Sequence, residues 1–377
     1  RVKRRCEIER IAEGCIDIRR TTGQHPGGIV VLPIGDEIHS FTPVQHPAND
    51  VKSGIVTTHF DYHSIDHNLL KLDILGHLDP TMIRMLQDLT GIDPLEIPLD
   101  SREVMSLFKD TSALGITPED IGGCKLGALG IPEFGTDFAM QMLIDTKPQY
   151  FSDLVRIAGL SHGTDVWLGN AQTLLKEGKA TISTAICTRD DIMIYLIQKG
   201  LESELAFTIM EKVRKGKGLT PCNKIQYMFP KAHAAAYVMM AWRVAYCKVF
   251  YPLAYYCAYY SIRANAFDYE KMAMGRERLE YYINDYKAKK ADGTISNVED
   301  DELKDMRIVQ EMYARGFEFV PIDIYKAKAR SFQIIDGKIM PSFKVISKVG
   351  ESAGESIEIA ARDGEFLSKD DLRQRAR

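Results

Sequence analysis

The spacing of hydrophobic and polar positions changes along this 377-residue chain. Residues 1–18 place apolar side chains at helical spacing among basic ones, which predicts a basic amphipathic helix. The stretches "GIVV", "IVTTHFDYHSID" and "LLKLDIL" are short and rich in β-branched and apolar residues, which predicts strands. Residues 1–110 are therefore expected to form a mixed α/β domain.

Helical spacing dominates the next region. A helix is expected from Asp79, an N-cap before Pro80, to a stop at Gly91. Two more helices, "RDDIMIYLIQKG" and "ESELAFTIMEKVRKGKG", each end at glycine. The stretch "AHAAAYVMMAWRVAYCKVFYP" predicts a long helix that stops before Pro252. We expect residues 111–265 to form a mainly α-helical domain.

The last region, residues 266–377, is more strongly charged. The stretch "EKMAMGRERLEYYINDYKAKKADG" predicts a charged helix that ends in a turn. The dipeptide Asp336-Gly337 between apolar runs predicts a β-hairpin. Helix-turn-helix material with several glycines follows, so this region is expected to be an α+β domain.

Composition narrows the class of protein. Hydrophobic residues make up 45% and charged residues 27% of the chain, as in ordinary globular proteins. The seven cysteines form no C-x-x-C pair, which argues against a disulfide framework and favours a reducing, cytoplasmic location. No apolar run is long enough to span a bilayer, so no membrane partner is expected. The net charge of −4 does not indicate a nucleic-acid binder, although basic residues cluster locally.

A carboxylate interrupts the apolar stretch "NLLKLDILGH". This stretch predicts a buried strand with Leu70, Leu72 and Ile74 on one face, and Lys71 and Asp73 on the other. Burial of a carboxylate is unfavourable unless the group is paired or holds a metal. Asp73 is therefore either an ion-pair partner of Lys71 or a metal ligand, with Lys71 near phosphates. Two-metal phosphoryl transfer needs several carboxylates, which one aspartate cannot supply.

Histidines offer a rival metal site. His59, His63 and His67 recur every fourth residue, which on a helix would align three imidazoles as in zinc enzymes. The surrounding stretch is rich in strand-forming residues, which would spread the rings apart, and no H-E-x-x-H motif is present. A metal-dependent hydrolase stays an alternative.

Two polar stretches are candidate loops for a ligand. The glycine pair of "RRTTGQHPGG" is either a plain turn or a close approach to a phosphate backbone. The side chains around that pair are Arg19, Arg20, Gln24 and His25. In "GLSHGTDVWLGNAQ", Ser161 and His162 predict a polar loop lining a ligand site, because adjacent residues cannot easily form a catalytic triad.

Basic residues gather on two helices. Arg214, Lys215 and Lys217 are either a solvated helix end or contacts to phosphates. Lys231 leads into the long helix, where His233 and Tyr237 share one face. A cation beside an aromatic platform suits a nucleotide, whereas the alternative is an aromatic stripe of the core.

Several stretches together resemble one family. They are "RTTGQHPGGIVV", "FDYHSIDHNLLKLDILGH", "LTGIDPLEIPLD", "GIPEFGT", "GLSHGTDVWLGNAQ", "RDDIMIYLI", "VRKGKGLT", "MFPKAHAAAYV" and "GEFLSKDDL". In this order they resemble the bacterial C-family replicative DNA polymerase, in the PolC-type form of the polymerase III alpha chain from low-GC Gram-positive bacteria.

The resemblance implies a fold. Residues 1–110 would be part of a palm with the polymerase-β-like nucleotidyltransferase sheet, residues 111–265 the fingers, and residues 266–377 a duplex-binding domain. A helix-hairpin-helix element would lie at about 342–363. Its turn has Lys348 where a hairpin glycine is usual, and Gly350 remains; the resemblance implies that these two residues contact the DNA backbone.

The resemblance also implies an activity, the template-dependent addition of dNMP to a primer 3′-OH. Asp73 would bind metal, one of three aspartates that hold two Mg²⁺ ions, with Lys71 near the triphosphate or primer end. The other two aspartates are expected before Arg1, so this chain alone should be inactive or nearly so. The dNTP would meet Ser161, His162, Arg189, Arg214, Lys215, Lys217, Lys231, His233 and Tyr237.

The partners implied are primer-template DNA, a sliding clamp and other replisome subunits. Family members carry more residues near Thr220–Cys222, and their clamp-binding peptide would follow Arg377. Besides the hydrolase, a non-catalytic DNA-binding module stays an alternative.

Overall fold

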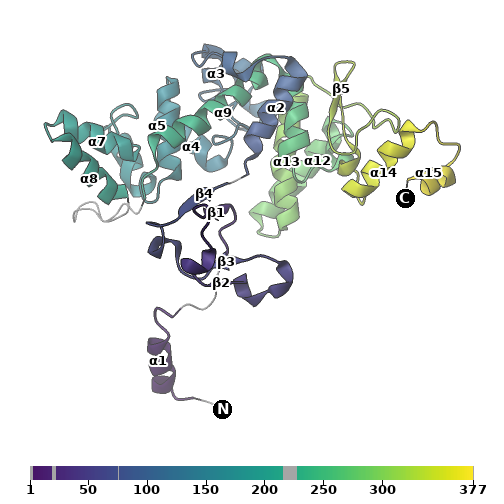
Figure 1. Ribbon diagram of the computed structural model, residues 1–377. Coiled ribbons are helices and arrows are strands. Elements are labelled where there is room, and N and C mark those ends of the chain that lie inside the picture. The colour runs from purple at the N-terminus through teal and green to yellow at the C-terminus, as the bar shows by residue number, and fades with distance from the viewer. Residues whose placement is uncertain (1–2, 19–22, 75, 215–226, 377) are drawn as a thin grey trace. The chain divides into compact units, whose positions relative to one another are not determined.

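The fold was analysed in a computed structural model, which describes residues 3–18, 23–74, 76–214 and 227–376 (Figure 1). The chain divides into two compact units, Arg1–His77 and Leu78–Arg377. Helices dominate the described residues, and the strands form three two-stranded antiparallel sheets. The expected combination of small sheets and a mainly helical body is therefore confirmed. The boundaries expected near 110 and 265 both lie within the second unit.

The first unit contains one α-helix and four short strands. The elements are α1 (Arg5–Gly14), β1 (Gly28–Val31), β2 (Val44–Gln45), β3 (Thr57–Thr58) and β4 (Leu70–Asp73). β1 pairs with β4, so that Gly28 lies opposite Asp73, and β2 pairs with β3. The basic helix expected over 1–18 is confirmed in a shorter form.

The expectation that β4 is buried was wrong. Leu70, Leu72 and Asp73 are exposed and Lys71 is half-buried, because β4 pairs with a single strand. Alternation along the strand is nevertheless as expected, since Lys71 and Asp73 contact each other on one face.

The second unit is built from helices. They are α2 (Leu78–Thr90), α3 (Arg102–Ser106), α4 (Asp137–Thr146), α5 (Phe151–His162), α6 (Gln172–Lys176), α7 (Arg189–Gln198), α8 (Ser203–Arg214), α9 (Lys231–Phe250), α10 (Pro252–Ala258), α11 (Tyr269–Met272), α12 (Arg276–Ala291), α13 (Asn297–Ala314), α14 (Glu351–Arg362) and α15 (Lys369–Arg375). A hairpin of β5 (Gln333–Ile335) and β6 (Lys338–Met340) lies between α13 and α14.

The long helix α9 organises the core of this unit. Alanines along "KAHAAAY" favour helix, and the helix ends at Phe250, before Pro252 starts α10. Helices α2, α3, α5 and α10 pack against α9. Trp242 on α9 is buried, and its indole N–H donates to the carbonyl of Pro98 at 2.8 Å. Tyr255 and Tyr256 on α10 are fully buried in the same core.

The predicted N-cap of α2 was wrong, whereas its predicted stop at Gly91 is confirmed. α2 begins at Leu78, so Asp79 lies in its first turn rather than at the N-cap, and its carboxylate contacts Arg263. Gly91 follows the helix with φ +75°, the left-handed conformation that suits a glycine stop. The expected helices α7 and α9 are confirmed, and α8 is confirmed as far as Arg214.

The C-terminal region contains the predicted hairpin, but the charged helix predicted from Glu270 onward is divided into α11 and α12. Gly275, with φ +106°, precedes α12 and interrupts the helix. α12 packs against α13, and the two helices lie side by side in Figure 1. Asp336 and Gly337 both have positive φ, as a two-residue hairpin turn requires. Over 342–363 the structure has a short 3-10 turn, Phe343–Val345, and then α14. The helix-hairpin-helix architecture stays a prediction.

Candidate functional site

The first candidate site lies on the paired strands β1 and β4. The Nζ of Lys71 lies 3.0 Å from Oδ1 of Asp73, and the Nδ1 of His25 lies 3.9 Å from the same oxygen. The ammonium of Lys71 also lies 5.6 Å from the ring centre of Tyr62. A carboxylate and a cation therefore share one exposed strand face, and both the ion-pair and the metal-ligand interpretations of Asp73 remain compatible with this geometry.

Gly28 allows this cluster to form. A Cβ atom at Gly28 would lie 2.8 Å from both Cε of Lys71 and Nδ1 of His25, closer than van der Waals contact allows. Gly28 thus lies close to side chains of the same unit, and the approach of the glycine pair to a phosphate backbone stays a prediction. Gln24 is exposed nearby in the chain, whereas Arg19 and Arg20 lie outside the described residues.

The donor set around Asp73 does not by itself fit a pair of metal ions. Among the described residues, no group of three or more metal-ligating side chains includes Asp73. The same holds for His59 and His67, and Nδ1 of His59 instead contacts Oε1 of Gln45 at 2.7 Å. The side chain of His63 lies outside the described residues. The described geometry therefore does not support a zinc site built from His59 and His67.

The second candidate site lies in the helical unit, where α5 ends. Ser161 and His162 belong to the last turn of α5, so the expectation that both lie in a loop was wrong. The Nε2 of His162 contacts a carboxylate oxygen of Glu133, which comes from the loop between α3 and α4. The sequence analysis did not assign a role to Glu133, although it lies in the quoted stretch "GIPEFGT".

Aromatic rings extend this site onto α9. The ring centre of His162 lies 4.8 Å from that of Phe229, and Phe229 lies 5.3 Å from His233. His233 and Tyr237 lie 4.6 Å apart, which confirms that they share one helix face. His162, His233 and Tyr237 therefore come together, as expected, although they are separated in the sequence.

Two cations flank the aromatic rings. The backbone N–H of Arg189 donates to the carbonyl of Phe229 at 3.1 Å, and the Arg189 guanidinium contacts Glu211 at 3.3 Å. The ammonium of Lys231 contacts Asp191 at 3.2 Å, and its backbone N–H donates to Asp190 at 2.7 Å. Both cations are paired with acids of α7 or α8, so they are held beside the rings.

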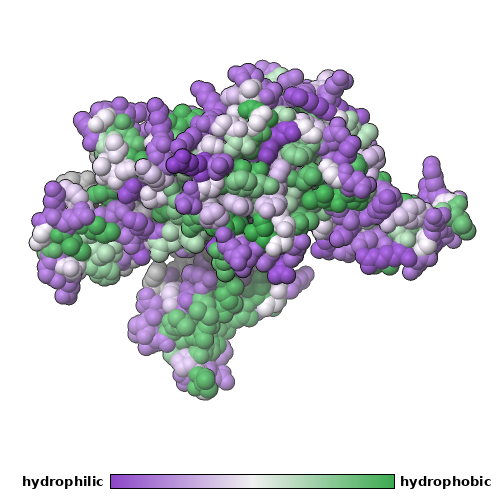
Figure 2. Space-filling model, turned by 90° about the horizontal axis from the view of Figure 1, so that it is seen from above, coloured by the Kyte–Doolittle hydropathy of each residue, from purple (hydrophilic) through white to green (hydrophobic). Residues whose placement is uncertain are grey.

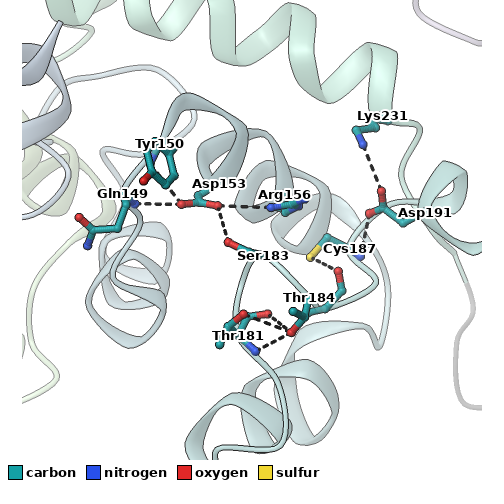
Figure 3. A network of polar contacts seen from close by, with 11 residues as sticks. Gln149, Tyr150, Asp153, Arg156, Thr181, Ser183, Thr184, Cys187, Asp191 and Lys231 are labelled. Atoms are coloured by element: carbon teal, nitrogen blue, oxygen red, sulfur yellow. Dashed lines mark hydrogen bonds and ion pairs between the residues drawn. The ribbon is translucent and has the colours of Figure 1, made fainter. Parts of the chain in front are cut away.

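Asp191 and Asp153 fix the backbone around this site (Figure 3). Asp191 accepts from the backbone N–H groups of Cys187 and Thr188, at 3.1 and 2.9 Å. Asp153 at the start of α5 accepts from the Ser183 hydroxyl at 3.3 Å and from the backbone of Gln149 at 2.9 Å. The loop before α7 is thereby hydrogen-bonded to both α5 and α7. These contacts help to fix the positions of Arg189 and Lys231, the first residues of α7 and α9.

The remaining predicted residues lie outside the described part of the chain or in the turn before α14. Lys215 and Lys217 lie outside the described residues, as does the side chain of Arg214. Lys348 and Gly350 lie before α14, and both are exposed. Lys348 has φ +66°, the conformation that glycine adopts most readily, so the lysine occupies the turn that a hairpin glycine was expected to make.

Two domain families match successive parts of the chain. The bacterial DNA polymerase III alpha NTPase domain matches residues 2–76, and the bacterial DNA polymerase III alpha subunit finger domain matches residues 79–235. The junction of the two matches coincides with the junction of the two units. The chain belongs to the PolC-type DNA polymerase III family.

Individual relatives agree with this assignment. DNA polymerase III PolC-type of Clostridium perfringens strain 13 / Type A is 52% identical over 389 residues, which cover 98% of this chain. DNA polymerase III PolC-type of Streptococcus pyogenes serotype M2 is 52% identical over 396 residues, which cover 99% of this chain. The PolC-type chain described here spans 27% of the length of each of these relatives.

Proposed function

We propose that this chain is the part of a replicative DNA-directed DNA polymerase that contributes to the catalytic palm and holds the incoming dNTP. The observation that carries the proposal is the cluster formed by the rings of His162, Phe229, His233 and Tyr237. The backbone of Arg189 donates to Phe229, and Lys231 begins the helix that carries His233 and Tyr237. Aromatic faces stack on bases, and cations neutralise phosphates, which is the combination that a nucleoside triphosphate needs. A histidine-based metal hydrolase leaves this cluster without a role, whereas a non-catalytic DNA-binding module would use it without any dependence on dNTP.

The domain assignment belongs to the same proposal. Residues 1–110 would contribute to the palm, residues 111–265 to the fingers, and residues 266–377 to a duplex-binding domain. The turn at Lys348 and Gly350, followed by α14, would be the phosphate-binding hairpin of a helix-hairpin-helix element. Gln24, His25, Arg19 and Arg20 would contact the DNA backbone from the palm side.

Asp73 and Lys71 would act at the reaction centre. We propose Mg²⁺ as the metal, with Asp73 as one carboxylate ligand and further carboxylates from elsewhere in the polymerase. When bound, two Mg²⁺ ions would stabilise the attacking and leaving oxygens of phosphoryl transfer. Lys71, held 3.0 Å from Asp73, would place a positive charge beside the triphosphate or primer end.

The ion pairs in the fingers would exchange partners when a nucleotide binds. Lys231 is half-buried and paired with Asp191, and Arg189 is paired with Glu211. A triphosphate carries more negative charge than either carboxylate, so it would compete for both cations. Arg214, Lys215 and Lys217 would add further contacts to phosphates, and Ser161 a hydroxyl near the base or sugar.

The partners proposed are primer-template DNA, dNTP, a sliding clamp and other replisome subunits. Contacts to DNA would be made mainly to phosphates, so binding should weaken as salt is raised. Among the residues that the structure describes, no helix combines the length and the apolar character that a membrane crossing requires. The cytoplasmic location expected from the cysteines stays a prediction.

Primer extension by the longest natural form of this protein tests the proposal. The Asp73→Asn variant should extend primers on the order of 10³-fold more slowly, because a lost metal ligand removes several kcal/mol of transition-state stabilisation. Asp36→Asn, which changes an exposed acid of the same unit, is the matched control and should extend like wild type. Equal rates for Asp73→Asn and wild type would show that Asp73 is a structural acid.

A binding measurement separates the polymerase from a DNA-binding module. In the presence of primer-template DNA, the dNTP that pairs with the template should tighten the complex, whereas a mismatched dNTP should not. Binding of DNA without any dependence on dNTP, and without extension, would favour the non-catalytic module.

A further inference from the structure

A buried lysine lies beneath the fingers site, away from the nucleotide-facing side chains. Lys248 on α9 has no exposed side-chain surface, and burial lowers the pKa of its ammonium group. Its Nζ lies 2.8 Å from Oε1 of Glu311 on α13, which is also fully buried. Such a pair is rarely retained for stability alone, because removing two charges from water is unfavourable. The other hydrogen bonds of Lys248 therefore indicate a second role.

The ammonium of Lys248 binds the backbone of the loop that carries Glu133. It donates to the carbonyl oxygens of Gly127 at 2.7 Å and Leu129 at 2.6 Å. The hydroxyl of Tyr255 donates to the same Leu129 carbonyl at 3.2 Å. The turn at 127–130 of this loop is thus fixed from the core by charge-assisted and neutral hydrogen bonds.

The rest of the loop has little freedom to move. Gly130 has φ +72°, and a Cβ atom there would collide with the hydroxyl of Tyr255. The backbone N–H of Gly135 donates to the carbonyl of Ile131 at 2.9 Å, and Phe134 is buried. Glu133 itself has φ +67°, a conformation that a residue with a side chain adopts only when its surroundings impose it.

Because the loop is fixed, the carboxylate of Glu133 in turn restricts the position of His162. Its carboxylate is largely buried and contacts the Nε2 of His162, while a carboxylate oxygen of Asp79 lies within 4.8 Å. Asp79 is in turn paired with Arg263. Each of the two acids is therefore held by a partner, Glu133 by His162 and Asp79 by Arg263, which limits the directions in which Glu133 can turn.

We propose that Lys248 is a positioning residue of the nucleotide site, which fixes the loop 127–136 and thereby holds Glu133 against His162. Because Glu133 accepts from Nε2, Nδ1 remains as the free polar atom of the ring, and the tautomer and tilt of the imidazole against Phe229 are set. The inference rests on the proposed function, since it assigns an anchor to that same site.

The experiment measures dNTP incorporation by the longest natural form of the protein. Glu133→Gln and Lys248→Met should each raise the KM for dNTP about tenfold, while kcat changes by less than about threefold. Glu133→Gln weakens the charge-assisted contact to His162, and Lys248→Met removes the two hydrogen bonds that hold the loop. Tyr255→Phe, which removes one hydrogen bond to the Leu129 carbonyl, should raise KM by about threefold. The control is Asp137→Asn on α4, an exposed acid paired with Arg307, which should leave both constants unchanged.

Double variants distinguish positioning from a general loss of structure. If Lys248 acts through Glu133, the Lys248→Met/Glu133→Gln variant should have the KM of the single variants, whereas independent effects would multiply. If Lys248→Met does not fold, the Tyr255→Phe/Glu133→Gln pair gives the same test. The dependence of kcat/KM on pH should change in Glu133→Gln and Lys248→Met but not in Asp137→Asn.

The outcomes separate this inference from the proposed function. Wild-type KM values in Glu133→Gln and Tyr255→Phe, together with the collapse of extension in Asp73→Asn, would overturn the positioning role alone. Multiplicative effects in the double variant would also overturn it. Absence of dNTP-dependent extension by the wild-type protein would overturn the proposed function and, with it, this inference.

Discussion

The two candidate sites each contain a carboxylate beside a cation, but they are supported in different ways. Lys71 and Asp73 lie on a two-stranded sheet, with side chains that are 25% and 54% exposed. Glu133 is 14% exposed and lies on a loop bound by the fully buried Lys248. The first pair can adjust to a ligand at little cost, whereas the second is held before any ligand arrives.

The difference indicates two ways of preparing a site. A metal ligand on a strand surface can be completed by other carboxylates, and exposure leaves it accessible to them. A nucleotide pocket must keep several rings and cations at fixed distances, which needs a packed core beneath it. Substitutions at the two sites should therefore differ in how much stability they remove.

Matched glycine substitutions test it most strongly. Gly130→Ala should lower the free energy of unfolding by about 3 kcal/mol, because the new methyl group meets Tyr255 at positive φ. Gly28→Ala should lower it by less than about 1 kcal/mol, since its neighbours are the movable side chains of Lys71 and His25. Calorimetric unfolding of both variants gives the measurement. Equal losses of unfolding free energy would show that the two sites do not differ in rigidity.

The pH dependence of stability that arises from Asp305 tests the effect of burial in the second unit. Burial raises the pKa of this carboxyl to about 6. Its ionised form therefore destabilises the fold once the pH exceeds the pKa that the carboxyl has in the unfolded chain. Wild type should therefore lose stability from this group as the pH rises from about 4 to about 6. Relative to wild type, Asp305→Asn should gain about 2 kcal/mol between about pH 4 and pH 7.

Urea unfolding at several pH values gives this difference. The amide oxygen of asparagine can still accept from the backbone of Ala266, so the variant retains that hydrogen bond. Parallel stability curves for the two proteins would show that Asp305 does not titrate in the folded state as stated.

Substitution of Lys71 tests the exposed pair of Lys71 and Asp73. Lys71→Met should change the free energy of unfolding by less than about 0.5 kcal/mol, because exposed ion pairs contribute little. Primer extension should nevertheless fall about tenfold, since one charge near the phosphates is lost. Lys52→Met, an exposed lysine of the same unit, is the control for extension. A large loss of stability in Lys71→Met would place this pair in the same class as the buried one.

The smallest effect is expected at the exposed α12–α13 surface. Lys289 and the N-terminus of α13 lower the pKa of Glu299 to about 2. Its stabilising contribution is present above the pKa of an unfolded glutamate and is lost as the pH falls from about 4.5 to about 2. Glu299→Gln should remove this part of the acid unfolding curve, seen by circular dichroism. An unchanged curve would show that the ion pair contributes nothing measurable.

Local patterns predicted most elements but not their burial. The stops at Gly91 and before Pro252, and the turn at Asp336-Gly337, follow from the backbone preferences of glycine and proline, which act within a few residues. The exposure of β4 depends on how many strands pair with it, and an apolar sequence does not encode that number.

The second candidate site was predicted only where local spacing places its residues on one helix face. His233 and Tyr237 share a helix face by spacing alone, so their contact could be foreseen. Glu133 and Lys248 lie far apart from their partners in the sequence, and a single glutamate in "GIPEFGT" carries no periodic signal. Such residues become visible only when the tertiary fold brings the loop, α5, α9 and α13 together.

The exposed pairing of β1 and β4 has a consequence for producing the protein. Ile29, Leu70 and Leu72 are each more than 40% exposed, and apolar side chains also appear among polar ones on the surface seen in Figure 2. Short apolar strands with open edges pair readily with further copies of themselves. Fragments of this family that end close to these strands should therefore precipitate at high concentration, and light scattering should fall when charged residues replace Ile29 or Leu70.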